Sequence, residues 1–255
     1  SDVVSAPLTS HPEPVMPPLL NALGQPIGFP VSTELPRPRP PRDPMKGRYC
    51  TVVPLDIDAH GEGLFEADSN DTSGRSWTYM PYGPFERLDD YLKWLQSDCT
   101  GEDPLFHTIL DSEDRPVGIA SYLRIQPAAG SIEVGHIHYS PLLQKTTAST
   151  EAMFLMMRRA FDELGYRRYE WKCDALNKDS QNAARRLGFT YEGVFRQATV
   201  YKGRNRDTAW LAIIDQDWPD IRQTYERWLA PENRDSKGRQ INPLQTGQNH
   251  RQKSV

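Results

Sequence analysis

Residues 131–165 decide the fold, and they run SIEVGHIHYSPLLQKTTASTEAMFLMMRRAFDELG. The first nine residues, 131–139, predict a strand. Residues 153–164 carry a broad apolar stripe at helical spacing that Gly165 closes, so they predict a helix whose methionines lie in the core. Small and polar residues open that helix at 149–152. A strand that leads through a short loop into an amphipathic helix indicates a sheet with a helix packed on its face.

The flanking segments extend this unit into a larger sheet. Strands are predicted at 49–55, 106–110, 116–125, 166–173, 189–200 and 208–214, and helices at 57–67, 88–95 and 179–187. Residues 111–114 form the turn of a hairpin, and the polar residues 202–207 connect the last two strands. The element order predicts an α/β (α+β) fold with a mixed, mostly antiparallel central sheet and helices on both faces.

The two ends of the chain differ from this middle part. Residues 1–44 are rich in proline, which excludes helix and central strand and predicts an extended N-terminal arm. Its apolar residues favour packing on the domain from about residue 20 onward, with a disordered leader as the alternative. The domain is expected at 45–228, and the polar residues 229–255 are expected to form a loose C-terminal tail.

Composition narrows the class of protein. The chain has 255 residues, a net charge of -4 and three cysteines at unrelated spacings. The weak acidity argues against nucleic acid as a partner, and the odd cysteine count favours reduced thiols without a zinc site. The chain has no signal-peptide pattern and no run near the ~18 apolar residues of a membrane span, so we expect a cytoplasmic protein without a membrane partner.

Three segments resemble the GNAT superfamily of acetyltransferases, in particular its ribosomal-protein alanine and antibiotic acetyltransferase branch, over about residues 45–218. They are EVGHIHYSP at 133–141, QKTTASTEA at 144–152, and NKDS at 177–180 followed by RLGF at 186–189. The resemblance implies a GNAT-like fold and acetyl-CoA as cosubstrate, and we expect a reaction without metal. The resemblance also implies coenzyme contacts from Tyr139, Gln144, Lys145, Thr146, Thr147, Ala148, Ser149, Thr150, Asn177 and Ser180.

The start of the helix at 149–152 has a physical reason to bind a pyrophosphate. Unpaired backbone N–H groups and the positive end of the helix dipole favour an anion there. Thr147 and Ser149 stand where the superfamily prefers glycine, so hydroxyl donors would replace a close backbone approach. The alternative is that Ser149 or Thr150 only caps the helix.

Acetyl transfer needs a neutral amine, yet a primary amine is protonated near neutral pH. Glu133 is the leading candidate for the base, with an ordinary salt bridge as the alternative. His136 and His138, two apart on one strand face, could relay the proton or be structural. Ala184 occupies the place of a tyrosine that protonates the thiolate in many relatives, which leaves Ser180 for that role. The resemblance places an oxyanion donor, a backbone N–H, near His138 or Tyr139.

The acceptor is indicated only by residue type. The aromatic segment 77–85 supplies Trp77, Tyr79 and Tyr82 as candidate acceptor contacts, or else a hydrophobic cluster under a loop. Cationic residues around the last hairpin could attract a carboxylate-bearing acceptor, or simply form a solvated turn: Arg196, Lys202, Arg204 and Arg206, beside Asp207.

The predicted function is transfer of acetyl from acetyl-CoA to the amine of a small molecule, by direct attack in a ternary complex. Acetylation of a protein or peptide N-terminus is the alternative among enzymes, and a non-catalytic acyl-CoA-binding module is the alternative outside them. The sequence leaves the oligomeric state open, with a homodimer as one option.

Overall fold

The computed structural model describes residues 17–247, which divide into two compact units between Glu34 and Leu35. In the first unit, β1 (Leu19–Leu20) and β2 (Pro26–Ile27) pair antiparallel. The Asn21 side chain closes their turn by accepting from the backbone N–H groups of Leu23 and Gln25, each at 2.9 Å. Within this unit the apolar side chains are exposed: Leu19, Leu20, Leu23, Ile27, Phe29 and Val31. The expected packing on the domain stays a prediction. The proline-rich residues before 17 lie outside the described residues.

The second unit is built on one sheet, in the strand order β3-β4-β5-β6-β7-β8-β10-β9. Every neighbouring pair is antiparallel except β7 and β8, which confirms the mixed, mostly antiparallel sheet. The strands are β3 (Met45–Lys46), β4 (Thr51–Pro54), β5 (Leu105–Leu110), β6 (Pro116–Gln126), β7 (Ser131–Tyr139), β8 (Arg168–Asp174), β9 (Thr190–Tyr201) and β10 (Arg204–Ile214).

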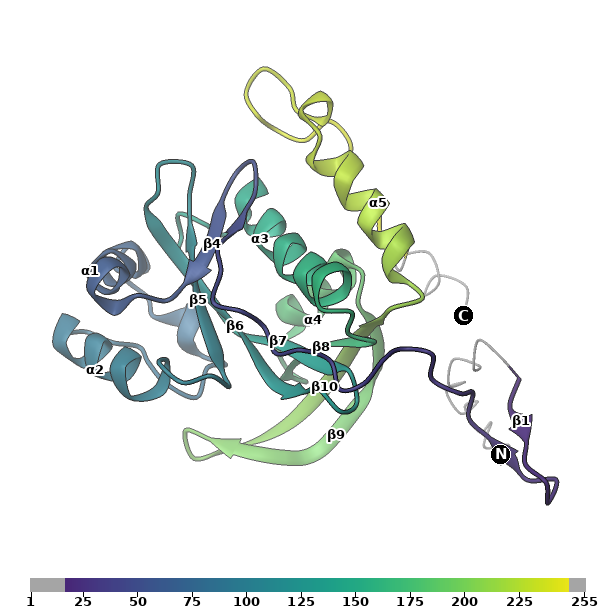
Figure 1. Cartoon of the computed structure of the whole chain (residues 1–255). Coiled ribbons are helices and arrows are strands. Elements are labelled where there is room, and N and C mark those ends of the chain that lie inside the picture. Colours follow the sequence, from purple (N-terminus) through teal and green to yellow (C-terminus); the bar gives the residue numbers. More distant parts are fainter. Residues whose placement is uncertain (1–16, 248–255) are drawn as a thin grey trace, which may run out of the picture. The chain divides into compact units, whose positions relative to one another are not determined.

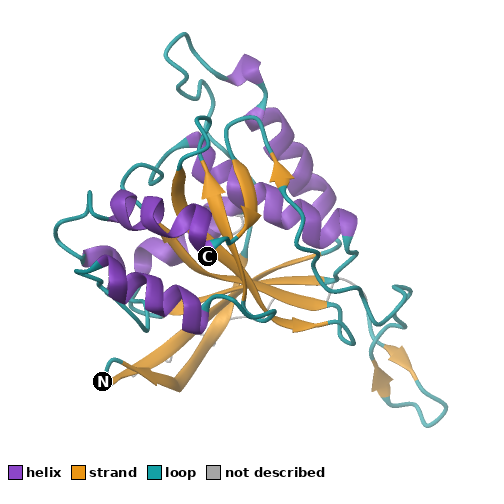
Figure 2. Ribbon diagram, turned by 60° about the vertical axis from the view of Figure 1, so that its left-hand side comes forward, coloured by secondary structure: helices purple, strands orange, loops and turns teal. Residues whose placement is uncertain are grey.

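Helices cover both faces of this sheet, as expected (Figures 1 and 2). On one face, α1 (Ile57–Asp68) and α2 (Leu88–Asp98) bury an aromatic cluster together with the short helix η1 (Arg75–Trp77). On the other face lie α3 (Thr147–Arg158), α4 (Lys178–Leu187) and α5 (Trp218–Leu229), and a π-helical turn, η2 (Arg159–Glu163), extends α3. The methionines of α3, Met153, Met156 and Met157, are buried in the core as predicted.

The parallel pair β7–β8 holds together at one end only. Its register runs from Ser131–Arg168 to Glu133–Glu170 and stops there. In β7, Gly135 pairs with Ser121 and His138 with Ile119, so two residues of β7 oppose one residue of β6. This β-bulge, at which His136 has φ 48°, absorbs one extra residue and points both histidines towards the α1–α2 side.

One turn and one boundary differ from the expected ones. The turn between β9 and β10 consists of Lys202 and Gly203, both with positive φ, as a two-residue hairpin requires. Arg204, Arg206 and Asp207 therefore lie in β10 and not in a loop. The expected arm also ends earlier than residue 44. Residues 35–44 belong to the second unit, where Asp43 O accepts from Arg159 Nη1 at 2.7 Å.

The expected loose tail is wrong for the residues that the structure describes. The helix α5 was not predicted. Beyond it, residues 230–247 include the short helix η3 (Pro231–Asn233) and fold back, burying Leu244 to 4% exposure. Residues 248–255 lie outside the described part. Within residues 17–247 no helix is both long and apolar enough to cross a membrane.

Candidate functional site

Two clefts meet where β7 and β8 separate. The larger, of about 910 Å³, runs from Ile137 and Tyr139 on β7 past the start of α3 to α4. The smaller, of about 290 Å³, lies on the side of Glu133 and the β9–β10 hairpin. Both clefts share the lining residues Tyr79, Met80, Ile137, Trp171, Asn177 and Ser180. A group held at these shared residues can reach both clefts.

The start of α3 forms one wall of the larger cleft. Thr146 caps the helix: its Oγ1 accepts from Ser149 N at 3.2 Å and donates to Leu143 O at 2.6 Å. Lys145 adopts φ 58° just before the cap, and the hydroxyl groups of Thr147, Ser149 and Thr150 also line the cleft. First-turn N–H groups, hydroxyls and a cation form a donor set that fits an anion.

All the residues predicted for coenzyme contact line this cleft except Ala148, whose side chain packs against the core. Two further cations, Arg186 and Arg239, line it beside Lys145, against one acidic residue, Asp179. Arg186 is held in place because its Nη1 donates to Thr150 Oγ1 at 3.0 Å. The charge balance of the larger cleft therefore fits a ligand with several phosphates.

The start of α4 brings Asn177 and Ser180 to the junction of the clefts. Asn177 Oδ1 accepts from Ser180 N at 3.2 Å, which is a helix cap. Ser180 Oγ accepts from Trp171 Nε1 at 3.0 Å, so the hydroxyl keeps its own proton for another partner. Burial raises the pKa of the neighbouring Cys173 thiol, and the Ser180 hydroxyl opposes that rise.

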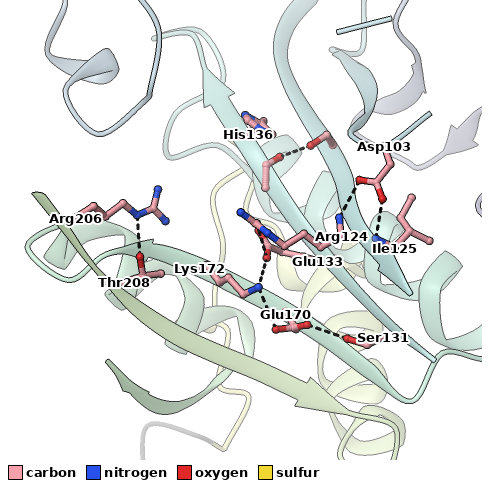
Figure 3. A network of polar contacts seen from close by, with 12 residues as sticks. Asp103, Arg124, Ile125, Ser131, Glu133, His136, Glu170, Lys172, Arg206 and Thr208 are labelled. Carbon is pink, nitrogen blue, oxygen red and sulfur yellow. Dashed lines mark hydrogen bonds and ion pairs between the residues drawn. The ribbon is translucent and has the colours of Figure 1, made fainter. Parts of the chain in front are cut away.

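Glu133 lies in the smaller cleft at the centre of a charged network (Figure 3). Its two carboxylate oxygens accept from Arg124 Nη1 at 2.9 and 2.8 Å, and Lys172 Nζ lies 2.9 Å from Oε1. Lys172 Nζ also lies 3.5 Å from Glu170 Oε2. The other carboxylate oxygen of Glu170, Oε1, accepts from Ser131 Oγ at 2.8 Å. Burial raises the pKa of Glu133, while the Lys172 and Arg124 cations oppose the rise. The salt bridge that was the alternative is therefore present, and the role of Glu133 as the base stays a prediction.

The two histidines of β7 have different surroundings. His136 lines the smaller cleft, its Nδ1 lies 2.7 Å from the hydroxyl oxygen of Tyr82, and burial lowers its pKa to about 4. His138 lines neither cleft: its ring stacks on Trp77 at 3.6 Å, and its Nδ1 lies 3.4 Å from Asp68. The structure therefore places the predicted catalytic His138 inside the aromatic cluster, because the bulge turns its side chain under η1.

The aromatic residues predicted to contact the acceptor also divide between the clefts and the aromatic cluster. Tyr79 lines both clefts, whereas Trp77 and Tyr82 belong to the cluster under α1 and α2 and line neither. The hydrophobic-cluster interpretation is correct for those two residues. Arg196 is exposed and lines neither cleft. Among the cationic residues of the β9–β10 hairpin, Arg206 lines the smaller cleft.

Several site residues were not singled out from the sequence. Arg124 and Lys172 stand at unremarkable strand positions, and only the sheet register brings them to Glu133. Arg239 and Gln240 line the larger cleft from the segment 229–255, which was expected to be loose, and Trp228 lines it from the helix α5, which was not predicted. In the described part of the chain, no three His, Cys, Asp or Glu side chains group together as a metal site would need.

The chain is similar to known acetyltransferases in sequence and in fold. Residues 51–190 match the family model of the acetyltransferase (GNAT) domain. A GCN5-related N-acetyltransferase from Brucella melitensis is 43% identical, with a TM-score of 0.83 over 86% of this chain and 100% of its own. A probable GNAT-family acetyltransferase from Chromobacterium violaceum is 36% identical, with a TM-score of 0.70 over 80% of this chain and 100% of its own.

A curated relative agrees with these structures. The Bacillus subtilis protein named Probable N-acetyltransferase YjcK is 27% identical over 184 residues, which cover 68% of this chain and 98% of its own. The family-model match spans the β7–α3 segment and the start of α4, which line part of the larger cleft. The chain therefore belongs to the GNAT family and is an acetyl-CoA-dependent acetyltransferase.

Proposed function

We propose that the protein transfers acetyl to the amine of a small molecule, by direct attack while both substrates are bound. The observation that carries this proposal is the junction of two clefts at Ser180, with Glu133 in the smaller one. Acetyl-CoA supplies the reactive thioester, and the larger cleft has the volume and donors for its phosphates. The smaller cleft, at about 290 Å³, suits a compact amine.

Glu133 removes the proton of the amine in this proposal. The carboxylate is only 3% exposed, and burial makes it a stronger base than an exposed glutamate. Arg124 and Lys172 oppose this rise and favour the ionised form, which is the form that accepts a proton. His136 is an alternative acceptor that is uncharged near neutral pH, because its pKa is about 4.

Ser180 and the backbone of β7 act on the other side of the reacting carbonyl. The Ser180 hydroxyl, oriented by Trp171, donates its proton towards the departing sulfur. Beyond Glu133 the backbone of β7 has no parallel partner on β8, which supports an N–H near His138 or Tyr139 as the oxyanion donor. A side-chain substitution there would leave this donor in place.

Arg206 favours an acceptor that carries an acidic group. Its Nε donates to Thr208 Oγ1 at 3.2 Å, which fixes the guanidinium in the wall of the smaller cleft (Figure 3). Arg124 adds a second cation on the same cleft. A carboxylate on the acceptor would pair with these cations while the amine faces Glu133.

An acceptor screen tests the proposal. The protein is incubated with acetyl-CoA and two panels, one of small amines with and without a carboxylate, the other of peptides with free N-termini. Mass spectrometry identifies acetylated products, and release of free thiol gives the rate. We expect turnover of small amines, fastest for those with a carboxylate. Turnover of the peptides alone would contradict the small-molecule assignment.

A further inference from the structure

The C-terminal clasp, which we define as residues 230–247, is a fixed part of the wall of the larger cleft. Asn233, only 8% exposed, donates from Nδ2 to Trp228 O and Asn242 O at 2.9 and 3.1 Å. Its Oδ1 accepts from Asn242 N at 2.8 Å, and Trp228 Nε1 donates to Gln240 Oε1 at 3.0 Å. The clasp is therefore held against α5 by satisfied hydrogen bonds and by buried Leu244.

The position of the clasp along the cleft follows from α4. Asn177 caps the start of α4 at the junction of the clefts, and Arg186 lies nine residues further along, roughly 13 Å on a helix that rises 1.5 Å per residue. Arg186 lies over the ring of Trp228, 5.5 Å from its centroid. Trp228 in turn bonds to Gln240 of the clasp. The clasp thus meets the cleft far from the reacting groups.

Arg239 is the cation that the clasp adds there. Asp235 fixes it: Oδ1 accepts from the backbone N of Lys237 and of Arg239, and Oδ2 accepts from Arg239 Nε, each at 2.9 Å. The two terminal nitrogens of Arg239 make no hydrogen bond to any residue between 17 and 247. A guanidinium in a cleft wall whose Nε is oriented and whose terminal nitrogens have no partner within residues 17–247 is suited to a phosphate.

We infer that Arg239 binds the 3′-phosphate on the ribose of coenzyme A. With the thioester at Ser180 and the pyrophosphate at the start of α3, the remaining stretch of the cleft takes the nucleotide end. That stretch is lined by Arg186, Trp228 and Arg239. The inference rests on the coenzyme occupying the larger cleft and is independent of the amine acceptor.

The test compares two ligands that differ only in the 3′-phosphate. Isothermal titration measures the binding of coenzyme A and of 3′-dephospho-coenzyme A to the full chain, to Arg239→Ala and to Lys237→Ala. Lys237 shares the turn but does not line the cleft, so its variant is the matched control. We expect the unaltered protein to prefer coenzyme A by about fivefold, the scale of a partly exposed charged contact. Arg239→Ala should lose this preference and Lys237→Ala should keep it.

Three results would overturn the inference. If Arg239→Ala leaves the affinity for both ligands unchanged, the 3′-phosphate contacts other residues. If it weakens both ligands by the same factor and lowers the melting temperature, Arg239 only holds the clasp. If the unaltered protein binds neither ligand, the placement of the coenzyme fails as well, and this outcome is distinguishable because it appears before any substitution.

Discussion

The larger and the smaller cleft meet at Ser180, yet different kinds of polar group line them. The larger cleft relies on backbone N–H groups at the start of α3 and on short hydroxyl side chains. The smaller cleft relies on buried ionised side chains, of which Glu133 and Lys172 are less than 10% exposed. Substitution cannot remove a backbone donor, whereas a buried charge depends on each of its partners. Substitutions in the smaller cleft should therefore change the rate strongly, and those in the larger cleft should change affinity moderately.

The largest effect is expected for Glu133→Gln. Loss of the base should lower the acetylation rate at neutral pH by about 100-fold or more. The affinity for acetyl-CoA should stay unchanged, because Glu133 does not line the larger cleft. Steady-state rates and isothermal titration measure the two quantities, and a parallel loss of both would make Glu133 a structural residue.

A smaller effect is expected for Ser180→Ala, at the junction of the two clefts. If the hydroxyl protonates the departing thiolate, the rate should fall by roughly tenfold, since water can replace part of a general acid. The substitution also leaves Trp171 Nε1 without its acceptor, so the melting temperature is measured in parallel. A normal rate in a folded variant would exclude Ser180 as the acid.

The larger cleft is tested at Thr147, where we expect a change in affinity and where Thr147→Gly should have the smallest effect. Thr147→Glu places negative charge against the expected pyrophosphate and should weaken acetyl-CoA binding by about tenfold, whereas Thr147→Gly keeps the backbone donors and should change it by less than about threefold. Titration of the two variants gives the comparison directly. Equal affinities would mean that the phosphates lie elsewhere.

The difference between the clefts also separates what the sequence could predict from what it could not. Part of the larger cleft comes from two continuous segments, so its residues within 144–152 and 177–180 were predicted from the family resemblance, all but Ala148 correctly placed along the cleft. The smaller cleft is assembled by sheet register across β6, β7 and β8, which a local pattern does not encode. His138 was misplaced for this reason, because one bulge residue decides which neighbours its side chain meets.

The C-terminal region shows a signal that could have been used. Trp218, Ile221, Tyr225, Trp228 and Leu229 recur at helical spacing, and Pro219 stands in the first turn, so α5 was predictable. The clasp that follows has one buried apolar anchor, Leu244, and is held by the side chain of Asn233. Polar anchoring of this kind gives no periodicity and becomes visible only in the folded chain.

The pH dependence of the rate in the unaltered protein and in Glu133→Gln tests the central claim most directly. Glu133 must be ionised to act, and burial raises its pKa, so the rate of the unaltered protein should fall as the pH drops through that raised value and should level off above it. In Glu133→Gln the rate should instead keep rising with pH, because alkaline solution supplies the neutral amine without help from the enzyme. A variant that shows the same profile as the unaltered protein would contradict the account and would make His136 the next residue to replace.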